Sequence, residues 1–438
     1  MTTADGLGAQ RVRRLSSLNA DRADLYRGPN VIVPPKHLMT TNCSGNSSSN
    51  NRLIMNNQPF DEVTSSGEET PQIATPLTPP MVTSADFAFV FDIDGVLLRG
   101  GKPIPEAVQA MKYINGENPW GVTVPYVFLT NGGGKTEAER CLDLSRQLEL
   151  DVHPGQFICG HTPMREMAER YNTVLVVGGE GEKCRIVAEE YGFKNVITPG
   201  DIIKTKQDTT PFRKLTEEEY KNSRFVDLEN TQIEAVFVFA DSRDWAGDQQ
   251  IIMDTLMTVE GKLNKRSEVY NEGPPCFFSH NDLIWSTSHD YSRIGMGALK
   301  TSLEAVYKAV TGKDLNTFAF GKPQMGTFQF ATRLLQEWRQ KSHDIADPPS
   351  TVYFIGDTPE SDIRGTNEFN KQSDIDWYSI LVKTGVWQEG TIPRYPPRKI
   401  CDNVYDAIKF AVEREQQKLI NHGDTLANIK INQSELKN

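Results

Sequence analysis

Three short apolar runs, each followed at once by polar residues, place the strongest limit on how this chain folds. The runs are FAFVF at 87–91, YVFLT at 126–130 and TVYFIG at 351–356. An unbroken apolar run of this length is typical of a strand buried on both faces of a parallel sheet. A stretch with helical character, IPEAVQAMKYI at 104–114, separates the first two runs. The alternation of strands and helices predicts βαβ units, and hence an α/β fold with a doubly wound, Rossmann-like parallel sheet.

The residues that follow these runs are of the types that handle phosphate and metal ions. In chain order they are Asp92 and Asp94, then Thr130, Asn131 and Gly132, then Asp357 and Asp362. Ligands of an open parallel sheet bind outside the carboxyl ends of its strands, so these residues are expected to meet in one crevice. Several carboxylates at one sheet edge repel one another unless a divalent cation lies among them. Because Mg²⁺ prefers oxygen ligands and binds substrate phosphate oxygens, the sequence predicts a Mg²⁺ site here.

Each motif by itself also has a purely structural explanation. An Asp-x-Asp-Gly sequence makes a good turn, and a Thr-Asn pair after a strand is often a helix N-cap. The stretch GGGKT at 132–136 resembles a nucleotide-binding P-loop, but that motif requires a glycine where this chain has Leu129. The P-loop is therefore excluded. The segment beginning at Thr136 is instead predicted to be an amphipathic helix with Ala138, Cys141, Leu142 and Leu148 on one face.

Four segments, DIDGVLLRG, FLTNGGG, FGKP and GDTPESDI, resemble in this order the four motifs of the haloacid dehalogenase-like (HAD) phosphohydrolases. The resemblance covers residues from about 87 to 390. The long interval between Asn131 and Lys322 resembles subfamily IIA, which contains p-nitrophenyl-phosphate and pyridoxal-phosphate phosphatases and carries a C2-type cap at this point. FLTNGGG, SHNDLIW and ILVKTGVW are most similar to the cat eye syndrome critical region-type branch. The Asn-Pro-Asp-Leu motif of that branch is replaced here by His-Asn-Asp-Leu at 280–283.

The resemblance implies a reaction in two steps. Asp92 is the implied nucleophile, which forms an aspartyl-phosphate, and Asp94 is the implied acid and base. An aspartate two positions after the nucleophile goes with phosphatases and phosphomutases in this superfamily. The predicted function is therefore Mg²⁺-dependent hydrolysis of a small-molecule phosphate monoester. A phosphotransferase or phosphomutase, and a non-catalytic binding or scaffold protein with the HAD fold, stay open.

The resemblance also implies how phosphate and metal are bound. The residues implied to bind phosphoryl oxygens are Thr130, Asn131, Gly132 and Lys322. The implied Mg²⁺ ligands are Asp92, the backbone carbonyl of Asp94, and Asp357. Asp362 is expected to orient these ligands. The candidates for lining the cleft from the cap side are Trp245, His280, Asp282 and Trp285.

Composition and motif spacing divide the chain into five parts. Residues 1–85 are rich in Ser, Thr, Asn and Pro without apolar periodicity, which predicts a disordered extension. The other predicted parts are a first core segment (86–172), an inserted α/β cap (173–315), a second core segment (316–415) and a polar tail (416–438).

Charge and cysteine usage limit the partners and the compartment. The formal net charge of −11 disfavours a nucleic-acid partner, and no apolar run is long enough to span a membrane. The six scattered cysteines indicate neither a zinc site nor a disulfide framework, which favours a reducing intracellular compartment. The resemblance favours mitochondria and a homodimer formed through the cap. Acidic residues among the N-terminal arginines do not fit a transit peptide, so the cytoplasm is the alternative.

Overall fold

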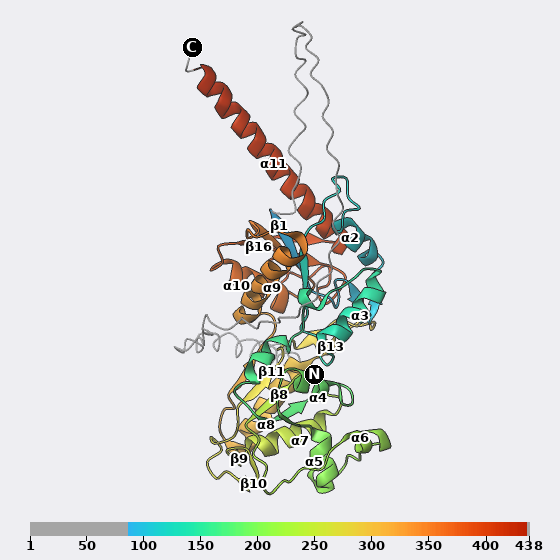
Figure 1. Cartoon of the computed structure of the whole chain (residues 1–438). Helices are drawn as coiled ribbons and strands as arrows, with labels where there is room; N and C mark the ends of the chain where they lie inside the picture. Colours follow the sequence, from blue (N-terminus) through green and yellow to red (C-terminus); the bar gives the residue numbers. More distant parts are fainter. Residues whose placement is uncertain (1–85, 436–438) are drawn as a thin grey trace, which may run out of the picture. The chain divides into compact units, whose positions relative to one another are not determined.

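The computed structural model describes residues 86–435, which contain two parallel sheets with helices against both faces (Figure 1). The α/β class and the doubly wound parallel sheet predicted from the sequence are confirmed. The extension predicted for residues 1–85 lies outside the described residues. Among the helices that the structure describes, none combines the length and the apolarity needed to cross a membrane.

The first sheet has six parallel strands in the order β17-β16-β15-β1-β4-β5. The strands are β1 (Phe87–Phe91), β4 (Tyr126–Leu129), β5 (Phe157–Ile158), β15 (Thr351–Gly356), β16 (Asp376–Val382) and β17 (Lys399–Cys401). The first of these strands in the chain, β1, lies between β4 and β15, so later strands are added on both sides of it. The three apolar runs of the sequence are thus the three neighbouring central strands.

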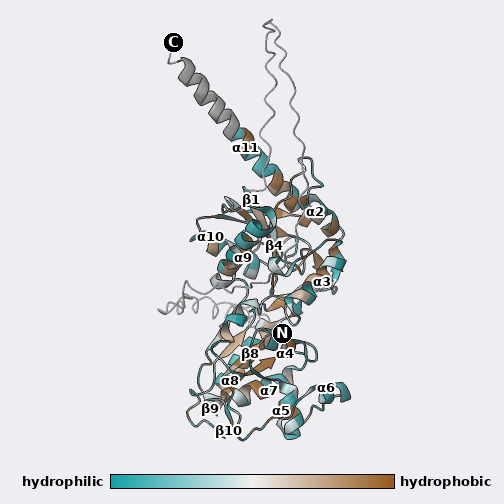
Figure 2. Ribbon diagram, viewed as in Figure 1, coloured by the Kyte–Doolittle hydropathy of each residue, from teal (hydrophilic) through white to brown (hydrophobic). Residues whose placement is uncertain are grey.

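Helices cover both faces of this sheet because the strand side chains alternate between them. Phe87, Phe89 and Phe91 pack on one face, and Ala88 and Val90 pack on the other. The helices on the first face are α2 (Ala107–Ile114), α3 (Glu137–Leu148) and α11 (Val404–Glu435). Those on the second face are α9 (Met325–His343) and α10 (Arg364–Asn370). The covering helices carry both hydrophobic and hydrophilic residues, as amphipathic helices do (Figure 2).

Helix α3 begins where the sequence predicts, with two differences in its buried face. Thr136 is the N-cap, and its hydroxyl and the Glu139 side chain form a reciprocal capping box. Ala138 was predicted to lie on the buried face but is exposed, and the same holds for Leu142, which is 58% exposed. Leu142 follows the buried Cys141 by one residue, which turns it about 100° around the helix axis and away from the sheet. The buried residues are Cys141, Leu144 and Leu148.

The second sheet has five parallel strands in the order β14-β11-β8-β6-β7. The strands are β6 (Thr173–Val177), β7 (Asn195–Ile197), β8 (Ala235–Val238), β11 (Cys276–Phe278) and β14 (Thr317–Ala319). Helix α4 (Lys183–Glu190) packs on one face. The helices on the other face are α5 (Pro199–Thr205), α7 (Trp245–Leu256) and α8 (Met296–Thr311). The sequence places β14 in the second core segment, but β14 pairs with β11 and so belongs to this sheet.

Short elements complete the described chain. The two-stranded ribbons are β2 (Leu98–Arg99) with β3 (Lys102–Pro103), β9 (Thr258–Val259) with β10 (Lys262–Arg266), and β12 (Ile284–Trp285) with β13 (Arg293–Ile294). Helix α6 (Glu217–Asn222) lies in the polar interval before β8. Helix α11 extends through most of the segment that the sequence predicts to be a polar tail, so those residues are helical as far as Glu435.

A buried ion pair fastens α4 to α5 in the second sheet's unit. Arg185 and Asp201 are each 1% exposed, and Nη2 of Arg185 lies 2.7 Å from Oδ1 of Asp201. Nη1 of the same guanidinium donates to the carbonyl of Val196 at the end of β7. Removal of one partner would leave the other charge buried and uncompensated, which is strongly destabilising.

We predict that Arg185→Ala lowers the free energy of unfolding by about 3–5 kcal/mol. Denaturant unfolding followed by circular dichroism measures this change. Lys112→Ala is the matched control, because Lys112 and Glu149 form an exposed pair (44% and 65% exposed) and its loss costs less than about 1 kcal/mol. Equal effects of the two substitutions would contradict a structural role for the buried pair.

Candidate active site

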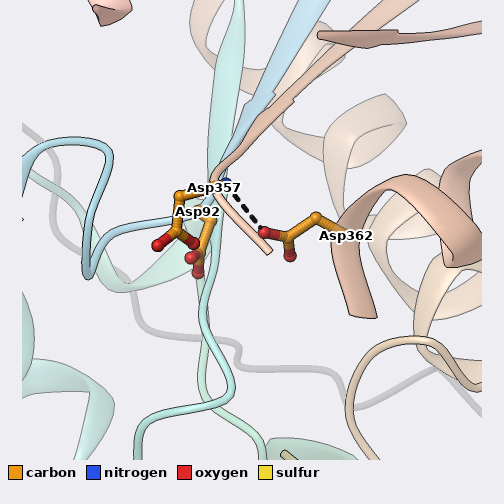
Figure 3. A group of neighbouring side chains, drawn as sticks. All are labelled: Asp92, Asp357 and Asp362. Carbon is orange, nitrogen blue, oxygen red and sulfur yellow. Dashed lines mark hydrogen bonds between the residues drawn. The ribbon is translucent and has the colours of Figure 1, made fainter. Parts of the chain in front are cut away.

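Three carboxylates meet where the central strands of the first sheet end. Asp92 follows β1 and Asp357 follows β15, and both are buried. Asp362, which is fully buried, reaches the same point from the turn before α10. One carboxylate oxygen of each residue lies within 4.8 Å of the other two (Figure 3). The sequence predicted this convergence from the strand ends, and the side-chain geometry confirms that the three acids gather.

Lys322 is the cation that faces these carboxylates. Its Nζ lies 2.6 Å from Oδ1 of Asp92 and 2.8 Å from Oδ1 of Asp362, and the side chain is 2% exposed. Asn131, far away in sequence, holds the backbone of Lys322 from both sides. The Lys322 N–H donates to Oδ1 of Asn131 at 2.8 Å, and Nδ2 of Asn131 donates to the Lys322 carbonyl at 3.1 Å. One lysine against three carboxylates leaves the group with excess negative charge.

Burial, together with this excess charge, raises the pKa values of Asp92 and Asp357. Burial raises the pKa of Asp92 well above its usual range, and the charges of Asp362 and Asp357 add to the effect, whereas Lys322 opposes it. Burial, followed by the charge of Asp362, raises the pKa of Asp357 to about 7. Buried acids that repel one another are stabilised by a divalent cation, so the donor set fits a hard metal ion such as Mg²⁺.

Backbone atoms closely surround the carboxylate of Asp357. Its Oδ2 accepts the N–H of Val386 at 2.7 Å. A Cβ on Gly95 would come within 2.1 Å of this oxygen, and a Cβ on Gly385 within 1.8 Å. Gly95 also has a φ of +89°, which a residue with a side chain rarely adopts. Glycine at these two positions therefore lets the backbone close around the carboxylate.

Asp362 shapes the loop that carries Asp357. Oδ2 of Asp362 accepts the backbone N–H groups of Asp357 and Thr358, each at 3.0 Å. Its Oδ1 is the oxygen that lies beside Lys322. The carboxylate thus connects the Asp357 loop to the lysine, which fits the orienting role that the sequence predicts for it. The same position would also allow it to act as a metal ligand.

The remaining predicted phosphate-binding residues lie beside Asp94. Thr130 is buried, and its Oγ1 accepts the N–H of Gly132 at 2.9 Å. A Cβ on Gly132 would lie 3.5 Å from Oδ2 of Asp94. Burial raises the pKa of Asp94, an effect opposed by the charges of Arg140 and Lys322. A carboxyl group with a raised pKa retains its proton to higher pH, which suits a general acid.

Of the four residues predicted to line the cleft from the cap side, Asp282 and His280 lie at this site. Oδ2 of Asp282 accepts a 2.8 Å hydrogen bond from Nδ2 of Asn131, so a residue of the loop after β11 contacts the second motif directly. His280 is 5% exposed, and its Nδ1 lies 3.8 Å from Oδ2 of Asp282. Trp245 packs against the apolar core of the second sheet instead. Trp285 lies in β12 and is 37% exposed.

Arg140 is a residue of this site that the sequence did not reveal. It lies in the first turn of α3, and a Cβ on Gly132 would come 4.0 Å from its Nη2. No sequence pattern distinguishes it from a surface arginine of an amphipathic helix. Its proximity to Asp94 becomes visible only when α3 is packed against the sheet.

Comparisons with known proteins identify the family of this chain. Residues 89–194 match a family model described as haloacid dehalogenase-like hydrolase, and residues 319–407 match one described as HAD-hydrolase-like. A cardiolipin synthase (CMP-forming)/mitochondrial hydrolase fusion protein of Schizosaccharomyces pombe is 38% identical over 332 residues, which cover 75% of this chain. The chain spans about half (54%) of the length of that fusion protein.

Two further proteins are similar to this chain. A mitochondrial hydrolase of Saccharomyces cerevisiae is 37% identical over 354 residues, which cover 76% of this chain and 97% of that protein. The crystal structure of a possible sugar phosphatase from Cytophaga hutchinsonii has 15% identity and a TM-score of 0.49, with 75% of this chain and 99% of that chain covered. On the strength of the near full-length yeast relative and the two matching family models, the chain belongs to the haloacid dehalogenase-like hydrolases.

Proposed function

We propose that this protein is a Mg²⁺-dependent phosphatase that hydrolyses a small-molecule phosphate monoester through an aspartyl-phosphate on Asp92. The observation that carries the proposal is the carboxylate of Asp92, which lies at a strand end beside Lys322 and within a group of three acids. A carboxylate held in this way is a nucleophile whose charge is balanced but not removed.

The reaction proceeds in two displacements at phosphorus. A carboxylate oxygen of Asp92 attacks the phosphorus, the bond to the leaving oxygen breaks, and Asp94 gives its proton to that oxygen. Asp94 then removes a proton from water, which attacks the phosphorus of the aspartyl-phosphate. This second step releases inorganic phosphate, restores the carboxylate of Asp92 and returns the proton to Asp94. The raised pKa of Asp94 supports its role as the acid of the first step.

Positive charge and hydrogen-bond donors would stabilise the transferring phosphoryl group. Lys322 balances the negative charge of Asp92 and of the incoming phosphate. The Thr130 hydroxyl and the N–H of Gly132 would turn toward phosphoryl oxygens when substrate is bound. Asn131 is the further proposed phosphate-binding residue, and its side chain bonds to Lys322 and Asp282 in this structure. Thr130 and Gly132 bond to each other in this structure, so phosphate would replace that contact.

The same carboxylates would hold Mg²⁺. Asp92, Asp357 and the backbone carbonyl of Asp94 are the proposed ligands, with Asp362 as support through the Asp357 loop. When bound, the ion would offset the repulsion between the nucleophile and the phosphate. The raised pKa of Asp357 supports this assignment, because a cation among the acids would favour their charged forms.

Several finer assignments remain predictions. The names of the two yeast relatives support a mitochondrial location, with the cytoplasm as alternative. The cat eye syndrome critical region-type branch, the cap-mediated homodimer and the absence of a nucleic-acid partner rest on the sequence. A phosphotransferase or phosphomutase would use the same Asp92 and Asp94, and a scaffold protein would use neither.

We expect Asp92→Asn to lower the hydrolysis of p-nitrophenyl phosphate at least about 1,000-fold, because the amide cannot form the acyl phosphate. Release of p-nitrophenol in the presence of Mg²⁺ measures the rate. Asp254→Asn, an exposed aspartate of α7, is the matched control and should retain wild-type activity. Full activity of Asp92→Asn would refute the mechanism. A wild-type protein that is inactive on a broad panel of phosphate esters would favour the alternative function, a non-catalytic binding or scaffold protein.

We also expect the metal-free protein to lose stability as the pH rises through the range between the ordinary aspartate pKa and about 7. The pKa of Asp357 is raised in the folded protein, so across that range the unfolded chain releases its proton first. Added Mg²⁺ should therefore raise the melting temperature more at about pH 8 than at about pH 5, with EDTA as the reference. Asp357→Asn should largely remove this difference. An equal Mg²⁺ effect at both pH values would argue against the coupling of metal binding to these carboxyl groups.

A further inference from the structure

The guanidinium of Arg140 has no anionic partner in the described part of the chain. Its side chain makes neither a hydrogen bond nor an ion pair with any residue that the structure describes, and its Nε is buried without a partner. Its one close contact of note is the ring of Phe157, whose centroid is 6.0 Å from the guanidinium carbon. A partly buried charge without a partner is costly, so such a group is a candidate receptor for an anion.

The neighbouring cations differ from Arg140 in this respect. Nζ of Lys135 lies 2.6 Å from a carboxylate oxygen of Asp143. Nζ of Lys322 contacts both Asp92 and Asp362. Around the second motif, Arg140 is thus the described cation whose charge is left available.

Arg140 lies near Asp94, the proposed general acid. A Cβ on Gly132 would lie 3.5 Å from Oδ2 of Asp94 and 4.0 Å from Nη2 of Arg140, so the two groups face the same small space. Nζ of Lys322, by contrast, lies 2.6 Å from Oδ1 of Asp92. The guanidinium is therefore placed near the proposed acid rather than near the nucleophile.

We propose that Arg140 binds a second anionic group of the substrate, carried by the leaving alcohol. The substrate class is then a phosphate monoester whose alcohol bears a carboxylate or a second phosphate. This inference rests on the proposed function, because Asp94 marks the leaving-group side only if it is the general acid. A guanidinium suits the task, since its fork of N–H donors matches the two oxygens of a carboxylate or phosphate.

The test compares substrates that share a three-carbon skeleton. The values of kcat/KM are measured with Mg²⁺ for glycerol 3-phosphate, 3-phosphoglycerate and 1,3-propanediol bisphosphate, and for p-nitrophenyl phosphate as a reference. 3-Phosphoglycerate carries a carboxylate as its second anion, and 1,3-propanediol bisphosphate carries a second phosphate. Comparison of these two substrates therefore distinguishes the two kinds of anion. We expect the wild-type protein to prefer at least one doubly anionic substrate over glycerol 3-phosphate by about 10-fold or more.

Arg140→Gln should remove that preference. It should lower kcat/KM about 10-fold or more for the preferred doubly anionic substrate, mainly through KM, and change glycerol 3-phosphate and p-nitrophenyl phosphate by less than about 3-fold. Arg140→Lys should restore part of the preference, because it keeps the charge but loses the fork. Arg146→Gln is the matched control, since it makes the same change at an exposed position of the same helix.

Two results would overturn the inference. One is a wild-type protein without preference for a second anion. The other is an Arg140→Gln variant with an unchanged melting temperature that loses activity equally on all four substrates, which would place Arg140 on the transferred phosphoryl group. Calorimetric binding of glycerol 3-phosphate and 3-phosphoglycerate to Asp92→Asn protein, with and without Arg140→Gln, tests the same preference without turnover. Failure of the proposed function, seen as absent p-nitrophenyl phosphate hydrolysis, is thereby separated from failure of this inference.

Discussion

The repulsion among three buried carboxylates is the constraint on which the architecture of the site depends. Asp92, Asp357 and Asp362 lie within 4.8 Å of one another in the interior, where charge is costly. Their arrangement persists because neighbouring groups contact each acid. Lys322 contacts Asp92 and Asp362, backbone N–H groups bond to Oδ2 of Asp357 and to Oδ2 of Asp362, and the proposed Mg²⁺ would supply the remaining positive charge.

The two sheets contribute to this balance in different ways. The first sheet supplies the acids, because its central strands end side by side. The second sheet leads into the lysine, since β14 ends just before the FGKP segment that carries Lys322. Asn131 joins the two contributions: it holds the Lys322 backbone and donates to Asp282 from the loop after β11. A substitution beside either sheet that shifts Lys322 or Asn131 is therefore expected to change the surroundings of Asp92.

The placement of charge also separates the two halves of the proposed reaction. Lys322 faces the nucleophile, whereas Arg140 faces the proposed acid, Asp94. In the proposed reaction, Lys322 would therefore act on the phosphoryl group and Arg140 on the leaving group. This division would connect the proposed mechanism to the proposed substrate class, and it arises from how one helix packs beside one strand end.

The sequence by itself determined the central strands, their parallel arrangement and the acids that follow them. These features depend on local periodicity and on the rule that parallel strands end at a common edge, so a linear pattern is enough to predict them. Only the tertiary structure decided that Asn131 holds Lys322, that Asp362 bridges the lysine to the Asp357 loop, that β14 joins the second sheet, and that Arg140 has no ion-pair partner among the described residues 86–435. Each of these depends on which residues far apart in sequence come into contact. Such contacts are set by the packing of whole elements, which leaves no periodic trace in the sequence.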